Sequence, residues 1–362
     1  MNRRLLFYTT SLSGGGAERV WVVLASELAR RGHDVTMAFD FDATENRAFL
    51  DPGVKVVVFG VGRRFSRHRR ALVGLIRLWR RLDPDFVLTA VGGSDVKGAL
   101  AGLLLGRLDR TIGSYHGYLA NESAFFGKLH VRLAALWTRL AATTVCVSDG
   151  LRRDMVETWR ASRTRCLRIY NPIAVAGTDP DLDAARLAAR DPLIAAAGRL
   201  VPVKGFGFLL RAFARVKTPG ARLVVLGEGP ERAELREEAE RLGLTDRLIL
   251  PGYVDAPWAW YARARCFALS SRVEAFGNVV VEALAHGLPV VATPCDGPRE
   301  ILTDGSMGVI SPFDDEAAFA AALDAALADP GDPAPRIARA AEFSVATAAD
   351  AYEALFDRLA SR

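Results

Sequence analysis

The chain has 362 residues, with 47 Lys and Arg against 42 Asp and Glu and a net charge of +5. Half of the residues are hydrophobic and a quarter are charged, which is the composition of a soluble globular protein without low-complexity tracts. No apolar run approaches the roughly 20 residues of a membrane-spanning helix, and none at the N-terminus resembles a secretory signal. The length exceeds what one compact core usually holds, so we expect two domains.

Charge is divided unevenly along the chain. Residues 1–171 carry 27 Lys and Arg against 15 Asp and Glu, whereas residues 172–362 carry 20 against 27. The first part therefore has a net charge of +12 and the second a net charge of −7. We expect the two parts to bind different partners.

The cysteines are far apart and have neither C-x-x-C nor zinc-like spacing; they are Cys146, Cys166, Cys266 and Cys295. Three of them lie in apolar runs that are typical of strands. Reduced, buried thiols in a cytoplasmic protein are the expected state.

Short apolar runs alternate with amphipathic stretches in the first part of the chain, which is typical of β-α units around a parallel sheet. The strands expected there are residues 5–8, 35–39, 54–59, 86–89, 111–115 and 144–147. The expected helices are residues 17–31, 69–82, 95–106, 123–141 and 149–159. We predict a Rossmann-like domain over residues 1–171.

The alternation breaks at Asn171-Pro172 and resumes after a segment rich in Gly, Asp and Pro, which we interpret as the interdomain connection. The strands expected beyond it are residues 193–197, 223–226, 248–250, 266–270, 290–292 and 308–310. We predict a second Rossmann-like domain over residues 172–345 and a C-terminal helix within residues 346–362. The fold class is α/β, with two domains facing a cleft and ligands at the carboxyl ends of the strands.

A glycine-rich loop, Ser-Gly-Gly-Gly at residues 13–16, follows the first expected strand and opens a helix. Glycines let the backbone approach a ligand and direct N–H groups at an oxyanion. With Asp40 after the second strand, the loop could instead be a dinucleotide-binding turn, but Arg19 stands where that motif needs its third glycine. A plain structural turn is the other alternative.

Arg199 and Lys204 lie in a loop just after the first strand of the second domain. Arginine offers a planar fork for two phosphate oxygens and lysine adds a point charge, so the two cations could hold a diphosphate. The spacing is not that of a Walker loop. The alternative is a solvated surface loop.

The most specific motif runs from Glu274 to Glu282 with the sequence Glu-Ala-Phe-Gly-Asn-Val-Val-Val-Glu. It predicts a strand end followed by a helix with Asn278 as its N-cap. The helix is apolar on every side, so we expect it to be buried, and Glu282 would need partners such as ribose hydroxyls. Glu274 could accept hydrogen bonds from a sugar, and N–H groups of residues 276–278 could meet phosphate oxygens. In the structural alternative, Glu282 is a salt-bridged core residue and Glu274 is a solvated acid.

His116 follows the fifth expected strand and precedes a glycine. A single histidine is more often structural than catalytic. Its position at a carboxyl end of the sheet favours contact with a ligand.

These motifs occur in this order in glycosyltransferase family 4, which the chain resembles over nearly its whole length. Pro289-Val-Val-Ala and Gly297-Pro-Arg-Glu-Ile also look like that family. The resemblance implies the GT-B fold, an acceptor-binding first domain, a nucleotide-sugar-binding second domain, and a C-terminal helix that can return to the first domain. It also implies that no metal or other cofactor is needed. Ala275, where the family often has glycine, is a small departure.

The resemblance also assigns roles: Arg199 and Lys204 contact the diphosphate, Glu282 the ribose and Glu274 the donor sugar. The implied donor-binding residues are Gly15, Gly16, Arg199, Lys204, Glu274, Phe276, Gly277, Asn278 and Glu282. The implied catalytic residues are His116, Arg199, Lys204 and Glu274.

The implied reaction is transfer of a hexose or N-acetylhexosamine from a UDP-sugar, with retention, to a lipid-linked glycan of bacterial polysaccharide synthesis. The cations would stabilise the departing diphosphate without a metal. The alternatives are a nucleotide-sugar 2-epimerase, a sugar phosphorylase of the same fold, an NAD-dependent oxidoreductase, and a transferase with a soluble acceptor.

The segment from Lys55 to Leu82 contains nine Lys and Arg and no acid. Apolar residues at helical spacing form one face beside a basic one; they are Leu72, Leu75, Ile76 and Trp79. We expect this segment to dock on the anionic cytoplasmic face of a membrane. The residues expected to face it are Arg63, Arg64, Arg67, Arg69 and Arg70. Alternatively, the apolar face packs on the sheet beneath solvated arginines. No nucleic-acid partner is expected.

Overall fold

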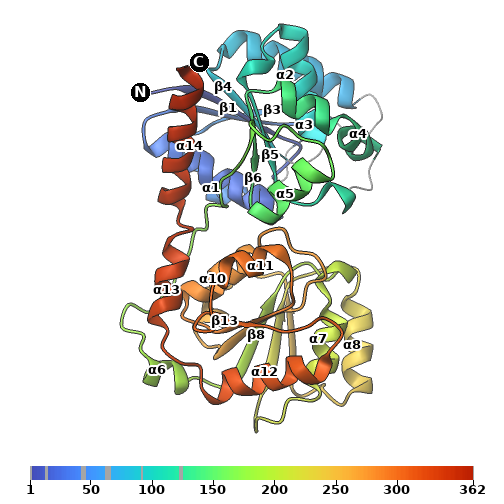
Figure 1. The fold of residues 1–362 in the computed structure, drawn as a ribbon, viewed down its shortest axis with the longest axis vertical. Coiled ribbons are helices and arrows are strands. Elements are labelled where there is room, and N and C mark those ends of the chain that lie inside the picture. The colour runs from blue at the N-terminus through green and yellow to red at the C-terminus, as the bar shows by residue number, and fades with distance from the viewer. Residues whose placement is uncertain are drawn as a thin grey trace. The chain divides into compact units, whose positions relative to one another are not determined.

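The computed structural model describes residues 2–12, 15–41, 46–61, 67–90, 93–121 and 125–361, with the backbone alone at residues 67, 121 and 125–132. The chain divides into two compact units. Unit 1 comprises Met1–Ile173 and Ser344–Arg362, and unit 2 comprises Ala174–Phe343. Each unit is built around its own parallel sheet (Figure 1).

Unit 1 contains a seven-stranded sheet in the order β3-β2-β1-β4-β5-β6-β7. Its strands are β1 (Arg4–Thr9), β2 (Asp34–Phe39), β3 (Lys55–Val58), β4 (Phe86–Ala90), β5 (Thr111–Tyr115), β6 (Thr143–Cys146) and β7 (Cys166–Arg168). Its α-helices are α1 (Gly16–Arg30), α2 (Arg67–Leu82), α3 (Gly93–Leu105), α4 (Phe125–Leu140), α5 (Asp149–Glu157) and α14 (Val345–Ala360). Short 3-10 turns lie at η1 (Arg47–Phe49), η2 (Leu108–Arg110) and η3 (Leu119–Asn121). The sequence prediction misses β7, a three-residue edge strand that ends in an exposed arginine.

Different helices cover the two faces of this sheet. Leu5 and Phe7 of β1 pack in one cluster with residues of α1 and α14, whereas Leu6 and Tyr8 pack in another with residues of α2 and α3. Alternate residues of a strand point to opposite faces, so a strand between two helical layers is apolar throughout. This explains why the strands appear in the sequence as continuous apolar runs.

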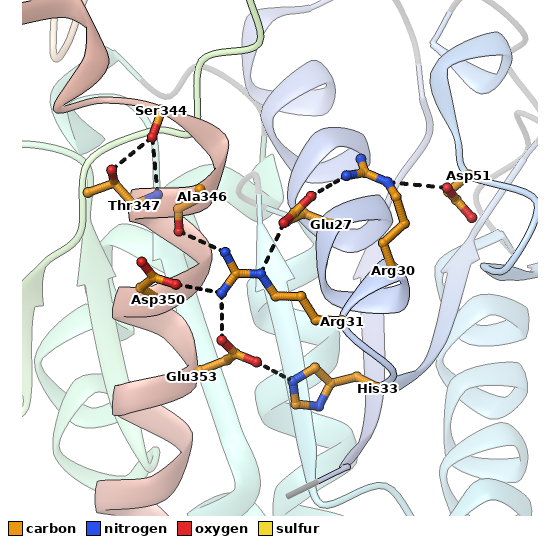
Figure 2. A network of polar contacts seen from close by, with 10 residues as sticks. All are labelled: Glu27, Arg30, Arg31, His33, Asp51, Ser344, Ala346, Thr347, Asp350 and Glu353. Carbon is orange, nitrogen blue, oxygen red and sulfur yellow. Dashed lines mark hydrogen bonds and ion pairs between the residues drawn. The ribbon is translucent and has the colours of Figure 1, made fainter. Parts of the chain in front are cut away.

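The C-terminal helix α14 packs against α1, which confirms its predicted return to the N-terminal domain (Figure 1). Its buried residues join the core of unit 1; they include Ala349, Tyr352, Leu355 and Phe356. Figure 2 shows the polar contacts beside this packing, where Arg31 pairs with Asp350 at 2.5 Å and Glu353 at 2.6 Å. Glu353 also lies 3.0 Å from Nε2 of His33. The last helix is therefore part of unit 1.

Unit 2 contains a six-stranded sheet in the order β10-β9-β8-β11-β12-β13. Its strands are β8 (Leu193–Ala197), β9 (Arg222–Leu226), β10 (Leu248–Gly252), β11 (Cys266–Leu269), β12 (Val290–Ala292) and β13 (Gly308–Ile310). Its helices are α6 (Ala184–Ala188), η4 (Pro202–Lys204), α7 (Phe206–Phe213), α8 (Arg232–Arg241), α9 (Trp258–Tyr261), α10 (Asn278–Ala285), α11 (Asp296–Ile301), α12 (Glu316–Ala328) and α13 (Ala334–Ala341). All six strands that the sequence predicts for this domain are present.

The two sheets share one topological feature. The first strand of each lies inside the sheet, with β1 between β2 and β4 and β8 between β9 and β11. The strand order reverses beside each of them, and open α/β sheets bind ligands at the carboxyl ends of the strands at such a point. Two parallel Rossmann-like sheets confirm the predicted fold class.

All four cysteines are free and buried, as predicted. The Sγ atoms of Cys146 and Cys166, on neighbouring strands, are 3.4 Å apart. Among the helices that the structure describes, none combines the length and the apolar character needed to span a bilayer.

Candidate active site

The loop after β8 carries both predicted diphosphate-binding cations at the carboxyl edge of the unit 2 sheet. Arg199 is exposed and makes no ion pair with another described residue. Lys204 ends η4, and its aliphatic stem lies 3.6 Å from the position that a Cβ on Gly198 would take. Gly205 follows with φ +65°, and a Cβ there would lie 2.2 Å from the carbonyl oxygen of Ser270. Only glycine fits this turn, which sets the position of Lys204.

An ion pair joins the two main motifs of unit 2. The Nζ of Lys204 lies 2.5 Å from Oε2 of Glu274, and the two side chains are 21% and 16% exposed. Glu274 is therefore not the solvated acid of the structural alternative. Both groups are still partly open to solvent, so a diphosphate could replace the carboxylate as the partner of Lys204. Glu274 would then be released to accept hydrogen bonds from a sugar.

The loop that carries Glu274 rests on the start of α11. The N–H of Gly297 donates to the carbonyl oxygen of Glu274 at 3.2 Å. A Cβ on Gly297 would lie 2.1 Å from the carbonyl oxygen of Phe276, so this contact requires glycine. The hydroxyl of Thr293 donates to the carbonyl oxygen of Ser271 at 2.5 Å. Gly297, the first residue of the Gly-Pro-Arg-Glu-Ile sequence, and Thr293 before it thus hold the loop that carries Glu274 in place.

The start of α10 differs from the prediction by one residue. Asn278 is the first helical residue, and Gly277 occupies the N-cap position with φ +93°. The chain enters the helix through a left-handed turn that glycine adopts without strain, so a side-chain cap is not used. The side chain of Phe276 is buried and packs edge-on against Phe343, with ring centroids 5.6 Å apart. Only the main chain of Phe276 could contact a ligand.

Helix α10 is mostly buried, as expected, but one side of it is partly open. Val280 and Val281 are buried, whereas Val279 and Glu282 are half-buried. An apolar sequence does not show which side of a helix its neighbours leave open. Glu282 accepts a hydrogen bond from the hydroxyl of Tyr261 at 3.3 Å.

Tyr261 belongs to no motif that the sequence shows, and sequence reasoning misses it. The only signal is its place in an aromatic run, Trp-Ala-Trp-Tyr, at residues 258–261. Burial and the neighbouring Glu282 carboxylate raise the pKa of Tyr261 well above its usual value. The phenol therefore stays neutral and remains a hydrogen-bond donor to Glu282.

In unit 1, the described part of the glycine loop begins at Gly15, the N-cap of α1; Ser13 and Gly14 lie outside the described residues. The Glu18 side chain folds back over Gly15, so that a Cβ there would lie 2.1 Å from its carboxylate. Gly16 is the first residue of the helix. The absence of a side chain at position 15 therefore makes room for Glu18.

Asp40, which could have held the ribose of a dinucleotide, is fully engaged within unit 1. It is 1% exposed, accepts a hydrogen bond from the hydroxyl of Tyr8 at 2.6 Å and pairs with Lys97. A carboxylate sealed in this way cannot bind a ribose, which argues against the oxidoreductase alternative.

His116 lies directly after β5 at the carboxyl edge of the unit 1 sheet. Its Nε2 is 3.1 Å from Oγ of Ser114, its side chain hydrogen-bonds Asn171, and its ring lies edge-on to Trp21 at 6.3 Å. Burial lowers the pKa of His116 from 6.5 to about 4. The imidazole is therefore neutral near pH 7, where it can exchange hydrogen bonds with a sugar but cannot supply positive charge.

The residues predicted to face a membrane are only partly described. Arg63 and Arg64 lie outside the described residues, as does the side chain of Arg67. Arg69 and Arg70 are exposed on α2. The apolar face of α2 packs on the sheet through Leu75, Leu78 and Trp79, with Leu72 and Ile76 partly buried against the same cluster. The core-packing alternative is thus correct for this face.

Two Rossmann-like units, each built on a parallel sheet, are the architecture of GT-B glycosyltransferases. Family models agree over both units. Residues 14–176 match Glycosyltransferase Family 4, and residues 179–343 match Glycosyl transferases group 1. The chain therefore belongs to the group 1/family 4 glycosyltransferases, which transfer a sugar from a nucleotide sugar.

Relatives agree with this assignment, and a solved structure agrees with the fold. The chain is 29% identical to lipopolysaccharide core biosynthesis glycosyltransferase LpsE of Rhizobium meliloti, over 87% of this chain and 86% of that protein. Over 47% of this chain and 46% of the relative, it is 34% identical to a Campylobacter jejuni transferase, N-acetylgalactosamine-N,N'-diacetylbacillosaminyl-diphospho-undecaprenol 4-alpha-N-acetylgalactosaminyltransferase. The structure of Anabaena Alr3699/HepE in complex with UDP and glucose has the same fold, with a TM-score of 0.81, 22% identity and complete coverage of both chains.

Proposed function

We propose that the protein transfers a hexose or N-acetylhexosamine from a UDP-sugar to a lipid-linked glycan, with retention of the anomeric configuration. The Lys204–Glu274 ion pair carries the donor half of this proposal, because it joins a phosphate-binding cation to a sugar-binding carboxylate at one sheet edge. The Anabaena structure that contains UDP and glucose supports a UDP-sugar as donor. The lipid-linked acceptor is supported by the name of the Campylobacter relative.

In the proposed reaction, the acceptor oxygen forms a bond to the anomeric carbon as the bond from that carbon to the diphosphate breaks. The electron pair of the broken bond stays on the diphosphate, and a phosphate oxygen takes the acceptor proton. Attack and departure occur on the same face of the sugar, so the configuration is retained. Arg199 and Lys204 stabilise the negative charge that develops on the leaving group, and this lowers the barrier rather than only improving binding.

A thermal-shift panel of nucleotide sugars tests the donor. We expect UDP-sugars to raise the melting temperature most, because ligands that bind the folded state stabilise it by mass action. Incubation of the best donor without an acceptor then separates transfer from 2-epimerisation, which would convert the donor alone. A response to NAD in place of every nucleotide sugar would overturn the proposal.

The proposal of a lipid-linked acceptor depends on one side of unit 1. This side is formed by helices α2, α3 and α4, and we name it the basic face. Helix α3 packs against both α2 and α4. The exposed arginines of α2 form no ion pair with another described residue; they are Arg69, Arg70, Arg77, Arg80 and Arg81. Helices α2 and α4 contain no Asp or Glu, and the one acid of α3, Asp95, is 6% exposed.

Exposed leucines lie on the same face. Leu103 and Leu104 of α3 are 52% and 64% exposed, and Leu136 and Leu140 of α4 are 47% and 43% exposed. Exposed leucines on helices that adjoin a helix with exposed arginines suit a surface with anionic headgroups and an apolar interior. Each arginine near an anionic membrane contributes about 1 kcal/mol, so five of them would suffice for reversible attachment. We propose that unit 1 docks on the cytoplasmic face of a membrane, where lipid-linked acceptors reside.

Liposome co-sedimentation tests the docking. Wild type should pellet with anionic vesicles at low salt and leave them as the salt concentration rises. Replacing the five α2 arginines by glutamine should abolish pelleting, and Leu103→Ser with Leu104→Ser should weaken it. A matched control replaces five exposed arginines elsewhere: Arg153, Arg163, Arg222, Arg236 and Arg358. Wild type that stays in the supernatant, or a control that loses binding equally, would overturn this half of the proposal.

A further inference from the structure

Tyr261 contacts the proposed donor site, through Glu282, without belonging to any of its motifs. We infer that Tyr261 is a positioning residue for ribose recognition: it holds the Glu282 carboxylate in the orientation in which that group meets the ribose hydroxyls. This inference rests on the proposed role of Glu282. It adds a residue that determines how strongly the enzyme distinguishes a ribonucleotide from a nucleotide without ribose hydroxyls.

The hydrogen bond from Tyr261 has a fixed direction. The side chain of Tyr261 is 0% exposed, so its hydroxyl must find a partner within the protein. That partner is Oε2 of Glu282, at 3.3 Å. Glu282 is half-buried on α10 and its side chain has three rotatable bonds, so the bond from Tyr261 restricts the positions that its carboxylate takes.

Aromatic packing holds the Tyr261 ring in place independently of any ligand. The ring lies edge-on to Phe267 at 5.7 Å and to His286 at 5.5 Å. Trp258 stacks on His286, with centroids 5.8 Å apart and planes 8° from parallel. The phenol oxygen therefore has a position set by the core of unit 2.

His286 ties this packing back to the helix that carries Glu282. It follows the last residue of α10, and its Nδ1 lies 2.8 Å from the carbonyl oxygen of Glu282. Its Nε2 lies 3.1 Å from the carbonyl oxygen of Ala176. Both the backbone and the carboxylate of Glu282 are thus held by aromatic residues, which is the arrangement that preorganises a binding group.

Calorimetry with two ligands, UDP and 2′,3′-dideoxy-UDP, measures ribose recognition directly. In Tyr261→Phe the ring stays and only the hydroxyl is lost. We expect the affinity for UDP to fall about three- to tenfold, the equivalent of one hydrogen bond, while that for the dideoxy compound changes less than about twofold. The KM for the donor should rise with little change in kcat, because the interaction concerns binding of the nucleoside.

Two further variants make the result decisive. Phe319→Leu disturbs the core of unit 2 at Phe208, away from the rings around Tyr261, so it should lower the melting temperature but keep the preference for UDP over dideoxy-UDP. Glu282→Gln should reduce that preference. If Glu282→Gln reduces it and Tyr261→Phe does not, the inference is wrong while the proposed donor site stands. If Glu282→Gln leaves the preference unchanged, the ribose role of Glu282 is wrong and the inference is overturned with it.

Discussion

The two units place different chemistry at equivalent edges of similar sheets. In unit 2, charged groups meet at the carboxyl edge while remaining partly open to solvent, as the Lys204–Glu274 pair shows. In unit 1, the carboxylate after β2, Asp40, is sealed against Lys97, and His116, after β5, is neutral. The fold alone does not decide whether a sheet edge can hold the phosphate site proposed for unit 2. The site needs charges that are held in place yet still accessible to the ligand.

The units also differ in how their cores are completed. Unit 2 is one continuous segment, Ala174–Phe343. Unit 1 needs α14 from the far end of the chain, whose buried aromatic residues cover α1 and β1. Nucleotide binding and the integrity of unit 1 should therefore be separable by mutation.

The largest effect is expected from Lys204→Ala. Loss of a cation at the leaving group should lower the transfer rate about 10²–10³-fold and weaken UDP binding by about 1–3 kcal/mol. Lys217→Ala, at an exposed lysine of the same unit, is the matched control for charge. Initial rates and calorimetry on both variants provide the measurement. Equal transfer rates and equal UDP affinities for the two variants would show that Lys204 has no special role at the carboxyl edge of unit 2.

The next effect is on the stability of unit 1. Phe356 is 0% exposed and stacks on Phe86 at 5.3 Å, so Phe356→Ala should cost about 3–5 kcal/mol. Urea unfolding followed by tryptophan fluorescence would report it. UDP binding to the folded variant should be retained, because Phe356 belongs to unit 1. Stability close to wild type would show that α14 is not needed by unit 1.

A smaller effect concerns pH. The folded-state pKa of His116 is about 4, against an ordinary value of 6.5. Between these values the unfolded chain binds the proton and the folded chain does not, so this residue lowers stability as the pH falls from about 6.5 to about 4. His116→Asn should lack this component, and its melting temperature should fall less steeply over that range. Parallel pH profiles for the two proteins would mean that His116 is not held neutral.

The smallest effect is expected from metal removal. Because Arg199 and Lys204 supply the positive charge at the proposed diphosphate site, transfer with excess EDTA should equal transfer with magnesium. Complete loss of activity on chelation, restored by a divalent metal, would contradict this prediction.

The sequence by itself predicts most of the secondary structure. The expected strand at residues 193–197 coincides with β8, Leu193–Ala197, and the amphipathic pattern of α2 predicts its basic and apolar sides. These features are local, because the patterns of a buried strand and of an amphipathic helix depend on consecutive residues. The motifs around Arg199, Lys204 and Glu274 are local in the same sense, since each is a short segment beside a strand end.

Only the tertiary structure decides which of these residues meet. Lys204 and Glu274 are 70 residues apart, and they pair because β8 and β11 are neighbours in the sheet, a relation that no local pattern contains. Tyr261 reaches Glu282 in the same way, from a segment without a motif. The burial of Leu75 and Trp79 likewise depends on the sheet against which α2 packs. Strand order and the burial of a helix side arise from contacts between distant segments, so they become visible only in the folded chain.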